Sequence, residues 1–68
     1  MDTEAFDYLG SINVAAENIA ALASSLIVIG KINEKAYCNV ANAYIEAIRT
    51  DMSVIGQCIH GLYRLHER

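Results

Sequence analysis

Proline and tryptophan are absent from this chain of 68 residues, and charged residues make up only 19% of it. There is also no internal repeat, no low-complexity tract and no strand-like alternation, so nothing in the composition favours a β-rich or disordered chain. Positive charge is scarce, because five Lys and Arg stand against eight Asp and Glu and give a net charge of -3. Nucleic-acid binding usually needs a basic face, so this balance argues against DNA, and against RNA, as the main partner.

The chain has only two cysteines, and they cannot form a disulfide within one molecule. Cys38 and Cys58 lie twenty positions apart on one expected helix, which separates them by roughly 30 Å at the rise of an α-helix. We interpret both thiols as small buried hydrophobic groups in a reducing compartment. If two copies of this helix packed antiparallel about Ile48, Cys38 of one would instead face the partner's Cys58.

Residue groups with catalytic spacing are lacking as well. The sequence has no Gly-rich phosphate loop, no paired carboxylates on one helix face, and no Ser or Cys with a His at a workable helical spacing. Cys58, His60 and His66 are the one cluster of metal-binding side chains, but positions 58 and 60 of a helix point about 200° apart. The sequence therefore predicts no enzyme, no metal site and no cofactor.

Signals for export or membrane insertion are weak. The N-terminal stretch Met1-Asp2-Thr3-Glu4 is acidic where a secretory signal would be basic. Uncharged segments cover 18–30 and 36–45, and both are shorter than the ~20 residues that a membrane span needs. We therefore expect a cytoplasmic protein that does not enter a membrane.

What the sequence does contain is one clear break between two helical patterns. Gly30 follows a long apolar run and is expected to end the first helix in the left-handed conformation. Asn33 can cap the next helix, with Glu34 in its first turn, and Ile32 and Tyr37 have the spacing of a hydrophobic staple. These signals predict a helix over about 3–29, a turn over 30–33 and a helix over about 34–65, all within one domain.

Apolar residues recur at three- and four-residue steps along both segments, so the chain is predicted to be all-α, a two-helix antiparallel hairpin. Hydrophobic residues make up 54% of it, which is more than one inner face can cover. We therefore expect two hairpins to associate into a four-helix bundle, or a higher oligomer. On the second helix we assign the larger residues to the contact within the chain. We assign the small flank to the dimer contact: Ala36, Val40, Ala43, Ala47, Val54 and Gly61.

Four residues of the second helix are candidates for binding a partner or ligand: Tyr37, Tyr44, Arg49 and Asp51. Tyrosines are frequent at binding hot spots, although core packing is the simpler explanation of these two. Arg49 is the best exposed basic residue, and pairing with Glu17 or Glu46 is its plainer role. Asp51 falls inside the apolar arc, where a carboxylate is costly unless it is paired or hydrated. It would either bond a Tyr hydroxyl or water at the dimer seam, or contact a ligand or a partner's basic group.

In layout, the predicted hairpin resembles the Rop family of small plasmid RNA-binding regulators, which are dimers of two-helix hairpins of this length. The resemblance covers the whole chain as architecture and would imply an RNA-binding regulator. From the residues themselves, the leading hypothesis is a small regulator or inhibitor of the phage or mobile-element type that binds a host protein. The other hypothesis is a ligand pocket between subunits, for example for a nucleotide, lined by Tyr44, Arg49 and Asp51.

Overall fold

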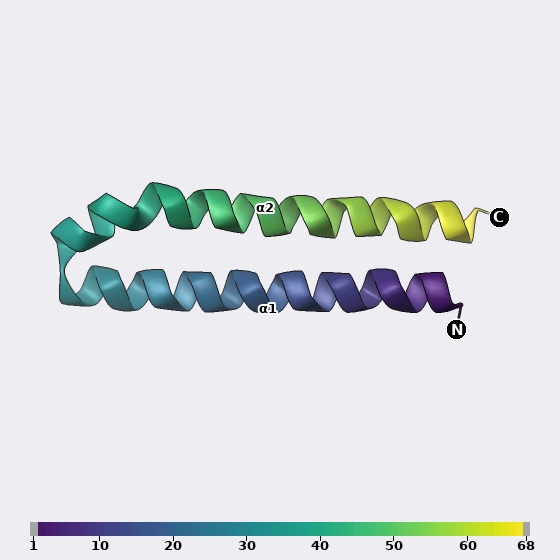
Figure 1. Cartoon of the computed structure of the whole chain (residues 1–68), viewed down its shortest axis with the longest axis horizontal. Helices are drawn as coiled ribbons and strands as arrows, with labels where there is room; N and C mark the ends of the chain where they lie inside the picture. Colours follow the sequence, from purple (N-terminus) through teal and green to yellow (C-terminus); the bar gives the residue numbers. More distant parts are fainter. Residues whose placement is uncertain (1, 68) are drawn as a thin grey trace.

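The computed structural model describes residues 2–67 as two long α-helices, α1 (Thr3–Ile32) and α2 (Glu34–His66). They lie side by side and antiparallel, so both ends of the chain are at the same end of a rod of 51 × 17 × 10 Å (Figure 1). No strand occurs within residues 2–67. The predicted all-α helical hairpin is confirmed.

The helix starts follow from the capping residues. The side chain of Asp2 accepts a hydrogen bond from the backbone N–H of Glu4 at 3.0 Å, and Glu4 is the acidic residue of the first turn of α1. Asn33 is extended (φ -155°, ψ 105°) and caps both helices. Its N–H donates to the Ile29 carbonyl at 2.9 Å, and its side chain accepts from the N–H of Ala36 at 3.1 Å. One residue therefore makes the turn.

The expected role of Gly30 is wrong. Gly30 lies inside α1, and no described glycine has a positive φ. The ring of Tyr37 packs over it, since a Cβ atom at this position would lie 3.3 Å from Tyr37 Cδ2. Ile32, which was expected to staple to Tyr37, is 80% exposed. The glycine thus makes room for a ring, while Asn33 ends the helix.

Replacing Asn33 with alanine tests this double cap. We expect Asn33→Ala to lower the free energy of unfolding by about 1 kcal/mol, because the N–H of Ala36 loses its acceptor. Denaturant unfolding at fixed protein concentration measures the change. Asn42→Ala, at an exposed site inside α2, is the control and should be neutral or slightly stabilising. An equal loss in both variants would contradict the assigned capping role.

The two helices meet along a seam of residues spaced alternately three and four apart, as in coiled coils. The ring of Tyr8 packs directly on Gly61, which fixes the register. In this register Ala15 lies opposite Val54 and Leu22 opposite Ala47, so that large residues face small ones. All seam residues are buried or half-buried. They are Ala5, Tyr8, Ile12, Ala15, Ile19, Leu22, Leu26 and Ile29 of α1, and Val40, Tyr44, Ala47, Asp51, Val54, Cys58, Gly61 and Leu65 of α2.

The seam differs from the expected assignment of α2 residues to the contact within the chain and to the dimer contact. Gly61, assigned to the dimer contact, is buried against Tyr8 of the same chain. Tyr37 and Ile59, assigned to the contact within the chain, are exposed. Cys58 is buried as expected, whereas Cys38 is exposed. Small residues bring the two helices of one chain close together, and much of the bulk of α2 is left outside.

The resulting core is thin. Ala15 (3% exposed) and Cys58 (8%) are the buried hydrophobic residues of the described chain, and no large side chain within it is fully buried. The accessible surface is 5177 Å², whereas a compact folded monomer of this mass exposes about 4,200 Å². The hairpin thus leaves about 1,000 Å² more surface than a compact chain would.

Helix α1 is also long and apolar enough to cross a membrane. Its most apolar window has a mean hydropathy of 1.7, and 6% of that window is buried in the hairpin. Length and composition alone do not separate a membrane span from a helix whose apolar surface is covered by protein.

Candidate functional site

The seam divides the surface of the hairpin into two faces of different character. In an antiparallel pair, the residues that directly follow Tyr8, Ala15 and Leu22 of α1 lie on one side of the seam. The residues that directly follow Ala47 and Val54 of α2 lie on that same side. On this side apolar residues recur at three- and four-residue steps, interrupted on α1 by Asn13 between Leu9 and Ala16. We call this surface the apolar face. It consists of Leu9, Ala16, Ala20, Ala23 and Ile27 of α1, and Ala41, Ile45, Ile48, Met52, Ile55, Ile59 and Leu62 of α2.

The apolar face contains no charged residue and is only partly covered within the hairpin. Its row next to the seam is mostly half-buried, whereas the outer row is exposed, including Ile27, Ile45, Ile59 and Met52, which is 58% exposed. Near the C-terminal end, Ile59 and Leu62 line a shallow depression of about 320 Å³ with Tyr63 and His66. An uncharged surface that extends from Leu9 to Ile27 on α1 and from Ala41 to Leu62 on α2 is a typical site of protein association.

The opposite side carries an open groove of about 680 Å³, which we call the polar groove. Its polar lining comes from Asp7, Ser11 and Asn18 of α1 and Asp51 of α2. The rest of the lining is largely apolar and includes Phe6, Val14 and Val54. A second hollow of about 360 Å³ continues it and shares Asn18 and Asp51. No Lys or Arg lines either hollow.

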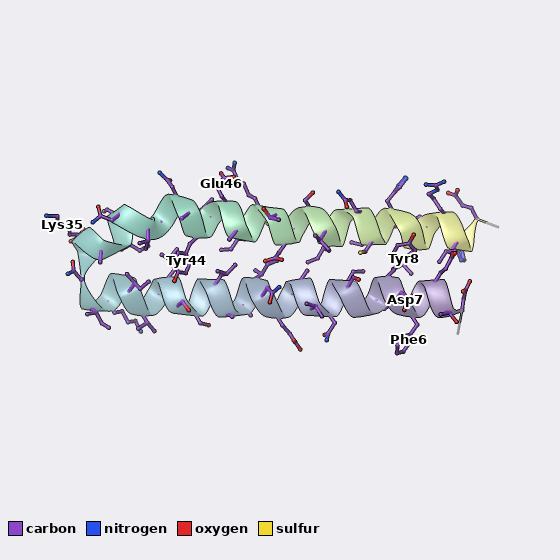
Figure 2. All side chains as sticks on the ribbon, viewed as in Figure 1. Phe6, Asp7, Tyr8, Lys35, Tyr44 and Glu46 are labelled. Carbon is purple, nitrogen blue, oxygen red and sulfur yellow. The ribbon has the colours of Figure 1, made fainter. Side chains whose placement is uncertain are left out.

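The four predicted site residues are not gathered in one place. Tyr44 and Asp51 line the same hollow of the polar groove, and Tyr44 points toward α1 (Figure 2). Arg49 is exposed and pairs with Glu46 at 3.5 Å. Glu46 lies on the side of α2 that faces away from α1 (Figure 2). Tyr37 lies at the turn against Gly30. Arg49 therefore pairs within its own helix, and not with Glu17, which accepts a hydrogen bond from Asn13.

Asp51 is the one acidic residue of the seam. It is half-buried, and its register position lies opposite Ile19. It makes no hydrogen bond or ion pair with the described residues 2–67, so the expected bond to a Tyr hydroxyl does not form within one chain. No side-chain oxygen in this part of the chain is both buried and unpaired, so the carboxylate reaches water in the polar groove. This placement leaves it available to a basic group from outside.

At the open end of the hairpin, the acidic start of α1 lies beside the end of α2. Glu4 and Arg64 line one cleft of about 450 Å³ with Tyr8 and Glu67. The opposite charges of Glu4 and Arg64 therefore lie at the same end of the hairpin. Exposed pairs of this kind contribute only about 0–1 kcal/mol each, so apolar contacts must hold the two ends together.

The sequence interpretation did not single out Ile45 and Met52 of the outer row, and it assigned Ile59 to the contact within the chain. The signal was present, because positions 41, 45, 48, 52, 55, 59 and 62 repeat the same three- and four-residue steps as the seam. No group of three or more His, Cys, Asp or Glu within the described residues could hold a metal ion. Comparison of the chain with protein-family models, with curated proteins and with solved structures found no match.

Proposed function

We propose that this chain is a non-enzymatic interaction protein that acts as a homodimer of hairpins, a four-helix bundle, in the cytoplasm. In this proposal the dimer is a small regulator or inhibitor, of the kind that phages and mobile elements encode, and it binds a host protein. The observation that carries the proposal is the thin core, since a hairpin with two buried hydrophobic residues, Ala15 and Cys58, has little to stabilise it alone.

The surface area supports a partner of standard size. The excess of about 1,000 Å² over a compact chain compares with the about 800 Å² that each partner buries in a typical stable interface. A protein that needs a partner in order to fold needs one that is present whenever it is made. A second copy of the chain meets this condition without further assumption.

Asp51 supports a second binding surface on the outside of such a dimer. A carboxylate in a helix seam lowers stability. Destabilising residues of this kind are expected mainly at functional sites. The polar groove offers Asp51 together with Asn18, Ser11 and apolar side chains such as Val14. This combination suits a basic and apolar segment of a protein. It does not suit the phosphates of a nucleotide, because Asp7 and Asp51 would repel them.

Measurement of the mass in solution tests the dimer. Light scattering after gel filtration should give twice the 7.4 kDa of the chain, and the melting temperature should rise with protein concentration. A stable folded monomer of 7.4 kDa would contradict the proposal.

Affinity purification from the native host tests the partner. The tagged chain should retain one host protein in a fixed ratio, and Asp51→Ala should lose this protein while its mass stays that of a dimer. The control is Arg49→Ala, because Arg49 pairs with Glu46 away from the groove. Absorbance of the purified protein near 260 nm from a bound nucleotide, or recovery of the chain in the membrane fraction, would contradict the proposal.

A further inference from the structure

We propose that the second copy of the chain docks on the apolar face, so that the two hairpins pack face to face and the polar grooves point outward. This inference rests on the proposed dimer and assigns the surface through which the two copies meet. It differs from the contact expected from the sequence, because Val40, Ala47, Val54 and Gly61 are already used in the seam of one chain.

The composition of the two faces indicates which of them the second copy covers. The apolar face presents Leu9, Ile27, Ile45, Met52 and Ile59 without a single charge, and all five are exposed in the hairpin. Burying such side chains stabilises a complex in proportion to the apolar area removed from water. The opposite side also carries exposed apolar side chains, Phe6 and Val14. Docking there would bury Asp7 and Asp51 as well, with no Lys or Arg in the lining of its groove to pair with them.

The geometry of the apolar face also fits a second copy. A two-fold dimer uses the same patch on both subunits, so the patch must complement itself. Here the α2 part carries large residues such as Ile48 and Met52, whereas the α1 part carries Ala16, Ala20 and Ala23. Large and small residues on one patch can interdigitate with those of an identical patch. On α2 the inner and outer rows together repeat at three- and four-residue steps, which is the spacing of helices packed in bundles.

The size of the apolar face agrees with docking of a second copy of the chain. The apolar face extends from Leu9 to Ile27 on α1 and from Ala41 to Leu62 on α2. The surface in excess of a compact chain is about 1,000 Å². A face-to-face dimer that buries this area on each hairpin reaches the size of a stable interface. It also covers the half-buried inner row, Ala41, Ile48, Ile55 and Leu62, and so completes a core between four helices.

The test compares one charge on each face. Met52→Glu places a carboxylate in the middle of the α2 stripe, and Val14→Glu places one in the lining of the polar groove; the two positions are equally exposed, at 58% and 56%. We expect Met52→Glu to raise the dissociation constant of the dimer by at least about 100-fold, because both copies would bury an unpaired charge. Val14→Glu should change the dissociation constant by less than about threefold relative to the unaltered chain, because it is a surface substitution outside the proposed contact. Analytical ultracentrifugation over a range of concentrations measures both.

A milder variant keeps the test decisive if Met52→Glu does not fold. Met52→Gln keeps the side-chain length and helix propensity and should weaken the dimer by roughly 10-fold while the chain stays helical at high concentration. If the unaltered chain is a dimer but Met52→Glu and Met52→Gln leave it intact, or if Val14→Glu dissociates it equally, the assigned face is wrong and the dimer stands. If the unaltered chain is itself a monomer, the proposed function fails first.

Discussion

A Gly61→Ala variant is expected to lose about 1–3 kcal/mol of unfolding free energy, although alanine is the better helix former. Gly61 is buried in the seam, and a Cβ atom there would lie 2.8 Å from both Cε atoms of Tyr8. Real Cβ atoms do not approach that closely, so either the ring or the helix must move. If the ring leaves, Tyr8 loses its packing at the open end of the hairpin.

Two other helical glycines provide matched controls for this prediction. Gly10 and Gly56 are exposed, and a Cβ atom on either would meet nothing within 4 Å. Gly10→Ala and Gly56→Ala should therefore stabilise the protein by about 0.5–1 kcal/mol each, through helix propensity alone. Denaturant unfolding at one protein concentration compares the three variants. A gain in stability for Gly61→Ala equal to that for Gly56→Ala would show that Tyr8 does not pack on Gly61.

The hairpin could be predicted from the sequence because its signals are local. Asp2 and Asn33 cap the helices that follow them through bonds to residues two and three positions away, and such bonds depend only on nearby sequence. The end of α1 was misassigned because Gly30 is adapted to a ring from the next helix. A glycine that ends a helix and one that makes room for a neighbour look the same in a single sequence.

The faces of the hairpin were harder to predict, because they depend on the register between distant segments. Tyr8 meets Gly61 from the other end of the chain, and this pairing decides which of two similar apolar stripes on α2 faces α1. Larger residues were expected inside, yet close packing of helices selects small ones, and Met52 and Ile59 are left exposed. Asp51 was recognised as unusual from its position alone, but its place opposite Ile19 required the register.

The second large effect is expected at Asp51, where a leucine should make the protein more stable. Asp51→Leu should raise the unfolding free energy by about 1–2 kcal/mol, since it replaces a half-buried carboxylate that has no partner within the described residues with a side chain able to pack on Ile19 and Val54. Leucine also favours the helix more than aspartate does. The control is Ser53→Leu, at an exposed position of α2, which changes propensity without filling the seam and should gain less than about 0.5 kcal/mol.

The same variant separates stability from binding. If Asp51 is kept in the seam to contact a basic group of a host protein, Asp51→Leu should melt at a higher temperature and yet no longer retain that protein on an affinity column. Stabilising changes that cost activity are typical of sites where function opposes folding. A destabilised Asp51→Leu would mean that the carboxylate is paired across the dimer and holds it together. A stabilised variant that still binds the host protein would leave the groove without a role for Asp51.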